Sequence, residues 1–150
     1  MNHRIPLLLV TLAALGGLLA LAGGAGADDE AGARTLFYNV TTDESWPAGM
    51  ALGQAAMAQE AGYRVVVFLN VRGVYLASKA RGHDTFSGSA KTAPQALEAL
   101  VAGGAVVQIC PMCMQKAGLA EEDLVPGIKL ASAEATFPVM TDPATTVVSY

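Results

Sequence analysis

Residues 105–113 read Ala-Val-Val-Gln-Ile-Cys-Pro-Met-Cys, an apolar run that ends in a Cys-x-x-C motif. The β-branched residues of this run predict a strand over 105–109. Pro111 suits the first position of a helix, where its missing N–H is not needed. The stretch therefore predicts a strand that leads straight into a helix, with Cys110 at the junction and Cys113 one turn further on.

The rest of the chain alternates in the same way between strands and helices. Further strands are predicted at 35–40, 65–69, 128–130 and 145–150, and helices at 45–61 and 92–101. The helix that Pro111 begins is predicted to continue over 114–117, and a last short helix runs from Ser132 to just before Pro138. A glycine-containing stretch over 71–91 is expected to be a long loop. The pattern predicts one α/β domain of three layers with a mostly parallel, five-stranded, flavodoxin-like sheet.

The N-terminal segment has the features of an export signal. Residues 5–27 carry no charge, and Ala25-Gly26-Ala27 places small residues before Asp28. We expect a signal peptide over 1–27, a short linker over 28–33 and the folded domain over 34–150. The protein would then be periplasmic, with no stable membrane association after cleavage; a retained membrane anchor is the alternative.

Composition excludes several classes of protein. The 150 residues are 53% hydrophobic and 15% charged, which excludes a disordered chain. All 13 acidic residues but only eight of the nine basic ones follow Ala27, so the mature domain has a net charge of −5. An acidic domain has no electrostatic reason to bind nucleic acid. The two cysteines stand too close together to brace the fold, which favours a chemical role for them.

Cys110 has the position of a reactive thiol. At the carboxyl end of a strand it would lie where ligands gather in open α/β sheets. As the residue that caps a helix it would face free backbone N–H groups, which favour the thiolate. The alternative is that both cysteines pack as small hydrophobic residues.

Several segments around this motif carry a resemblance to a known family. They are residues 66–70, 73–77, 104–110, 118–119, 123–127 and 147–150. In these segments the chain resembles the DsrE/DsrF-like family, small α/β proteins that carry sulfur on a cysteine or pass it along a relay. The resemblance implies that Cys110 takes the place of the sulfur-accepting cysteine and that Cys113 matches a second cysteine found in some members. It also implies a sulfur donor or acceptor, either a protein or a small sulfane-sulfur species, as partner.

Three kinds of chemistry remain open for the Cys-Pro-Met-Cys-Met sequence. In the first, Cys110 holds a persulfide and Cys113 resolves it or receives the sulfur, without a cofactor. In the second, both thiolates bind Cu(I), with Met112 or Met114 as auxiliary ligands. The third, thiol–disulfide exchange, ranks below these, and zinc is weaker still because only His83 could add to the cysteines. The sequence does not separate a sulfurtransferase from a non-catalytic carrier.

A few other side chains could serve the site. His83 could act as a base, although an isolated histidine in a glycine-rich loop is more often a solvated surface residue. Arg72, Lys79 and Arg81 could attract an anionic sulfur species, or they could be ordinary surface charges. Trp46 would pack at a helix start or at a subunit contact.

The sequence is richer in apolar side chains than a small core needs. Met50, Met57, Phe86, Met140 and Tyr150 are the surplus groups. The resemblance to the family implies a trimer or a hexamer of this fold, and surplus apolar surface is commonly buried between subunits. We therefore expect a homotrimer or a homohexamer.

Overall fold

The computed structural model describes residues 31–81, Thr85 and 90–150. The predicted signal peptide, His83 and Phe86 lie outside the described residues. The elements, in chain order, are β1 (Thr35–Val40), α2 (Ser45–Glu60), β2 (Arg64–Leu69), the 3₁₀ helix η1 (Val71–Ala77), α3 (Ala93–Ala102), β3 (Val106–Ile109), α4 (Pro111–Lys116), the 3₁₀ helix η2 (Glu121–Asp123), β4 (Lys129–Leu130), α5 (Ala133–Met140) and β5 (Thr145–Ser149).

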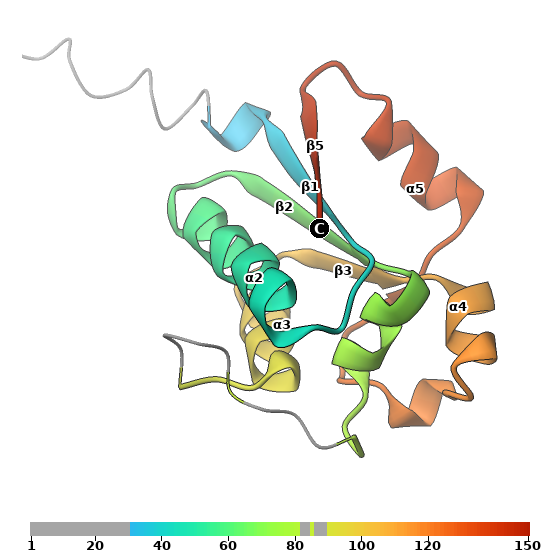
Figure 1. The fold of residues 1–150 in the computed structure, drawn as a ribbon. Coiled ribbons are helices and arrows are strands. Elements are labelled where there is room, and N and C mark those ends of the chain that lie inside the picture. The colour runs from blue at the N-terminus through green and yellow to red at the C-terminus, as the bar shows by residue number, and fades with distance from the viewer. Residues whose placement is uncertain (1–30, 82–84, 86–89) are drawn as a thin grey trace, which may run out of the picture.

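The five strands form one sheet in the order β4-β3-β2-β1-β5, and every neighbouring pair is parallel. The predicted α/β fold is confirmed, and the sheet is wholly parallel where a mostly parallel one was expected. In such a sheet the carboxyl ends of all strands lie at the same end of the sheet (Figure 1). Residues that follow different strands in sequence therefore come together there.

Helices cover both faces of the sheet. Tyr38, Val67 and Val107 point to one face, where they join the main core with residues of α2 and α3. The opposite face meets α5, because the Thr136 hydroxyl donates a 2.9 Å hydrogen bond to the buried Gln108 side chain of β3. The three layers follow from the alternation of side chains along each strand.

The predicted loop over 71–91 starts with a helix instead. Residues Val71–Ala77 form η1, which packs against the end of β1 and against α4. Gly73 makes this packing possible, because a Cβ atom there would overlap the carbonyl oxygen of Val40 and lie 3.0 Å from its carbon. Only glycine fits at this approach of two backbones.

Helix α4 begins at Pro111, the residue that the sequence predicts for its first position. Two other boundaries differ from prediction. Helix α5 continues through Pro138 to Met140, so the prediction that it ends before Pro138 is wrong. A proline at this position removes one hydrogen bond to the Glu134 carbonyl, and both residues are exposed, so water can replace that bond. Residues 31–33, expected to be linker, are helical.

Across the described part of the chain, every helix is too short or too polar to cross a membrane.

Candidate functional site

Cys110 stands at the junction between β3 and α4. Its backbone is extended (φ −69°, ψ 114°), and it caps the helix that Pro111 begins. The backbone N–H of Cys113 donates a hydrogen bond of 3.4 Å to the Cys110 Sγ. The sulfur is half-buried and carries no disulfide. A partly accessible thiol that receives a backbone N–H is arranged to bear negative charge.

Cys113 lies one turn along α4, in contact with the same sulfur. Burial and a hydrogen bond between the two thiols raise the pKa of Cys113 above its usual value. The backbone N–H of Val71 and the charge of Lys116 act in the opposite direction. Cys113 therefore keeps its thiol proton to a higher pH than a free cysteine does.

The turn that contacts Cys113 is strained. Val71 has a φ of +49°, a conformation that β-branched residues rarely adopt. Neighbouring bonds hold it there, since the Asn70 N–H donates to the Val40 carbonyl and the Arg72 N–H to the Thr41 carbonyl, each at 3.0 Å. The strained turn begins η1, which packs against α4.

A ladder of polar side chains crosses the sheet next to the cysteines. The Asn70 amide donates to the Asn39 side-chain carbonyl at 2.5 Å, and the Asn39 amide donates to the Ser149 hydroxyl at 3.0 Å. Because β2 and β3 pair in register to their last residues, Asn70 and Cys110 leave the sheet side by side. The sequence analysis missed this ladder; polar residues at the ends of strands were the available signal.

The predicted basic cluster is organised around an acid. Arg72 binds Asp43 through two hydrogen bonds of 2.8 and 2.9 Å, and Arg81 reaches the same carboxylate at 2.9 Å. The Arg81 guanidinium also lies 4.1 Å from the centre of the Tyr75 ring. Burial would raise the pKa of Asp43, but the hydrogen bonds and charges of the two arginines hold it below its usual value. Much of the positive charge expected to attract anions is therefore neutralised locally.

The two methionines of the motif differ in their burial. Met114 is buried in the main core, whereas the side chain of Met112 is 78% exposed. Of the four groups considered for Cu(I), the structure thus brings together Cys110 and Cys113. Among the described residues no group of three or more His, Cys, Asp or Glu side chains could hold a metal ion. The position of His83 is outside the described part.

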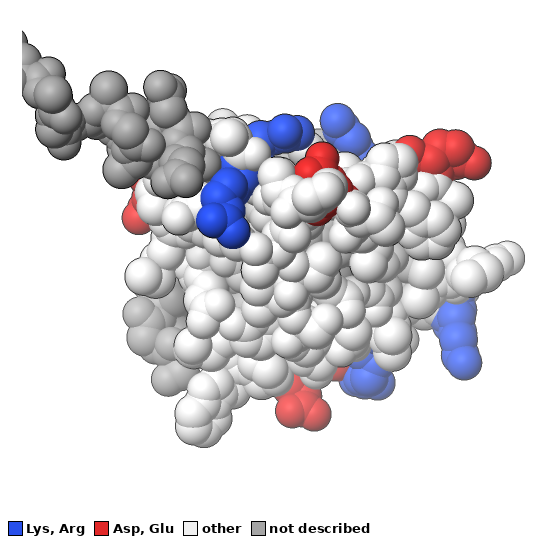
Figure 2. Space-filling view, turned by 90° about the horizontal axis from the view of Figure 1, so that it is seen from above, with Lys and Arg blue, Asp and Glu red and all other residues white. Residues whose placement is uncertain are grey.

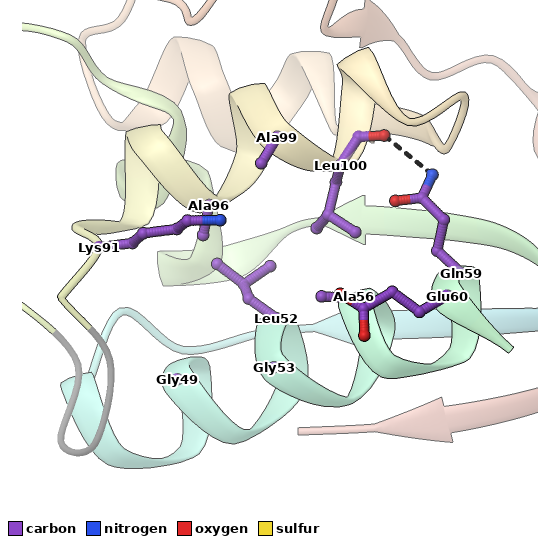
Figure 3. A pocket seen from close by; sticks show the side chains of 10 residues that line it. All are labelled: Gly49, Leu52, Gly53, Ala56, Gln59, Glu60, Lys91, Ala96, Ala99 and Leu100. Atoms are coloured by element: carbon purple, nitrogen blue, oxygen red, sulfur yellow. Dashed lines mark hydrogen bonds between the residues drawn. The ribbon is translucent and has the colours of Figure 1, made fainter.

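A separate groove of about 260 Å³ lies between α2 and α3 (Figure 3). Leu52 and Leu100 lie inside it, while Lys91 stands at one end and Glu60 toward the other. The groove shares no residue with α4 or η1. The cysteine pair therefore lies at the carboxyl ends of the strands and apart from this groove.

Comparison with known proteins bears on the family. Residues 35–145 match the DsrE/DsrF-like family. An uncharacterised protein of Methanocaldococcus jannaschii is 38% identical over 82 residues, which cover 55% of this chain and 68% of that protein.

Solved structures share the fold. The ychN protein of E. coli superposes with a TM-score of 0.64 at 16% identity, covering 78% of this chain and 98% of the other. A protein of unknown function from Methanobacterium thermoautotrophicum superposes with a TM-score of 0.61 at 13% identity, covering 78% and 99%. At these identities the structures support the α/β fold alone. With the family match over residues 35–145, they lead to one conclusion: the chain belongs to the DsrE/DsrF-like family.

Proposed function

We propose that this protein is an exported sulfur carrier that holds sulfane sulfur as a persulfide on Cys110. Membership of the DsrE/DsrF-like family supports a sulfur-relay type of function. The partner would be a small sulfane-sulfur species or a protein that donates or accepts sulfur.

One observation carries the proposal. The Cys110 sulfur lies at the carboxyl edge of the sheet, half-buried, and accepts the Cys113 N–H at 3.4 Å. This donor stabilises negative charge on the sulfur, both in the thiolate and in the persulfide anion. A cysteine that served only as a small hydrophobic residue would have no need of this position or donor.

The loading step can be written with thiosulfate as donor. The Cys110 thiolate attacks the outer sulfur of thiosulfate and forms a new S–S bond. The bond between that sulfur and the sulfonate group breaks, and sulfite leaves with the bonding electron pair. The product is the persulfide anion of Cys110, so charge and atoms balance without a cofactor.

The cellular site of the proposed function is the periplasm. The uncharged segment before Asp28 supports export, with cleavage after Ala27. Mass spectrometry of the exported protein is expected to find a chain that begins at Asp28. A chain that still begins at Met1 would contradict the cleavage.

Exposed apolar side chains support assembly into a homotrimer or a homohexamer. Trp46, Met50, Met57 and Val147 are between 43% and 78% exposed. In Figure 2, which looks down on the view of Figure 1, a broad area of the surface carries no Lys, Arg, Asp or Glu side chain. Exposed apolar side chains can be buried between subunits. Light scattering at micromolar concentration is expected to give three or six subunits, and a monomer would contradict this assembly.

Intact-mass measurement tests the carrier function. The reduced protein is incubated with thiosulfate or polysulfide, and separately with Cu(I). We expect a gain of one sulfur atom that disappears in Cys110→Ser and survives in Cys113→Ser. A protein that gains no sulfur but takes up Cu(I) tightly, with both cysteines required, would replace sulfur carriage by metal binding.

A further inference from the structure

Cys110 and Cys113 are already neighbours before any sulfur is loaded. Cys110 caps helix α4, and the Cys113 backbone N–H donates a 3.4 Å hydrogen bond to the Cys110 Sγ. Both thiols are free and half-buried. Cys113 can therefore approach the Cys110 sulfur without a rearrangement of α4.

This contact decides which sulfur of a Cys110 persulfide Cys113 would attack. The Cys113 N–H occupies one side of the Cys110 Sγ, so a second sulfur bound there has to project away from α4. Displacement at the inner sulfur requires a nucleophile that approaches opposite the persulfide bond, which is from the side of α4 that carries Cys113.

We propose that Cys113 discharges the persulfide carried by Cys110, releasing sulfide and closing a Cys110–Cys113 disulfide. This inference rests on the proposed function and deepens it.

The step balances as written. The thiol proton of Cys113 passes to the outer sulfur of the persulfide anion. The resulting Cys113 thiolate forms a bond to the Cys110 Sγ, the persulfide S–S bond breaks, and hydrosulfide leaves with the electron pair. The products are one disulfide and one hydrosulfide ion, so atoms and charge balance. The Cys113 sulfur is oxidised and the sulfane sulfur is reduced, while the Cys110 sulfur keeps its oxidation state. The disulfide product implies a following reaction with a dithiol reductant, which returns both cysteines to thiols.

Time-resolved intact mass and sulfide measurement test the proposal. The reduced protein, Cys113→Ser and Cys113→Ala are loaded with inorganic polysulfide and desalted. In the unmodified protein the adduct of one sulfur should decay to a species two hydrogens lighter than the reduced chain, with one equivalent of sulfide released. Both Cys113 variants should hold the adduct about tenfold longer or more, because they lack the neighbouring nucleophile.

The outcomes separate the two proposals. Equal decay in the unmodified protein and in both Cys113 variants overturns discharge by Cys113, as does transfer of the sulfur to Cys113 without loss of mass. If no variant takes up sulfur, the carrier function itself fails.

Discussion

Replacing Gly73 by alanine tests whether the close approach of η1 to β1 holds the site together. The added Cβ would overlap the carbonyl oxygen of Val40 and lie 3.0 Å from its carbon. Both atoms belong to backbone at the end of a central strand, where neither can move freely. The turn must therefore shift away from β1.

The cost has two parts. Forcing extra volume into a packed site costs about 1–3 kcal/mol. The shift also weakens the hydrogen bonds from Asn70 to Val40 and from Arg72 to Thr41, each worth about 1 kcal/mol. Because relaxation relieves part of the overlap as those bonds lengthen, we expect Gly73→Ala to lower the free energy of unfolding by about 3 kcal/mol.

Urea denaturation of the reduced protein, at fixed protein concentration, measures this change. Gly53→Ala is the matched control, since nothing lies within 4 Å of a Cβ at that position inside α2. It should raise the free energy of unfolding by about 0.5–1 kcal/mol, as alanine stabilises a helix relative to glycine. A Gly73→Ala protein within about 0.5 kcal/mol of the original would refute the argument from close approach.

Three further outcomes follow from the described contacts. Asp43→Asn should lower the free energy of unfolding at pH 7 by about 1 kcal/mol. The fold holds the pKa of Asp43 below 3.8, so the stabilisation by its carboxylate is present above that pH and is lost on acidification. The urea midpoints of the two proteins should therefore converge as the pH falls below 3.8. Thr136→Val leaves the buried Gln108 side chain without its hydroxyl donor and should lower the free energy of unfolding, measured in urea, by about 1–3 kcal/mol. Thr141→Val removes an exposed hydrogen bond and should change the same quantity by less than about 0.5 kcal/mol. Val71→Gly relieves a left-handed backbone that costs about 1–2 kcal/mol, but glycine also raises the entropy of the unfolded chain. A thermal melt should therefore show a net stabilisation of about 0.5–1 kcal/mol, and a lower stability would contradict the argument from strain.

The sequence predicted the order and type of most elements because their patterns are local. The strand over residues 105–109, Pro111 and the place of Cys110 at their junction can all be read from nine consecutive residues. The helix of residues 71–77 could not be read in this way, since its stability depends on contact between Gly73 and Val40. The extension of α5 beyond Pro138 depends on exposure, which a sequence does not state.

The surroundings of the cysteines were less predictable. Asn39, Asn70 and Ser149 are joined by hydrogen bonds across 31 and 110 positions of the chain. Asp43 collects two arginines that the sequence suggested were available to anions. The left-handed backbone of Val71 is the least expected feature, because a β-branched residue argues against it. These contacts form only in the folded protein, where the carboxyl ends of the strands lie side by side.

Strand β5 forms an edge of the sheet, and this has a consequence for the exchange of its amide hydrogens with solvent. The Tyr150 N–H donates to the Asn39 carbonyl of β1, so by alternation the amides of Thr146 and Val148 also face β1. The amides of Val147 and Ser149 then point away from the sheet, toward a side where the described residues supply no strand. In deuterium oxide the isolated chain should exchange every second amide of β5 quickly. A protein that docks along this edge would reveal itself by slowing that alternate set alone.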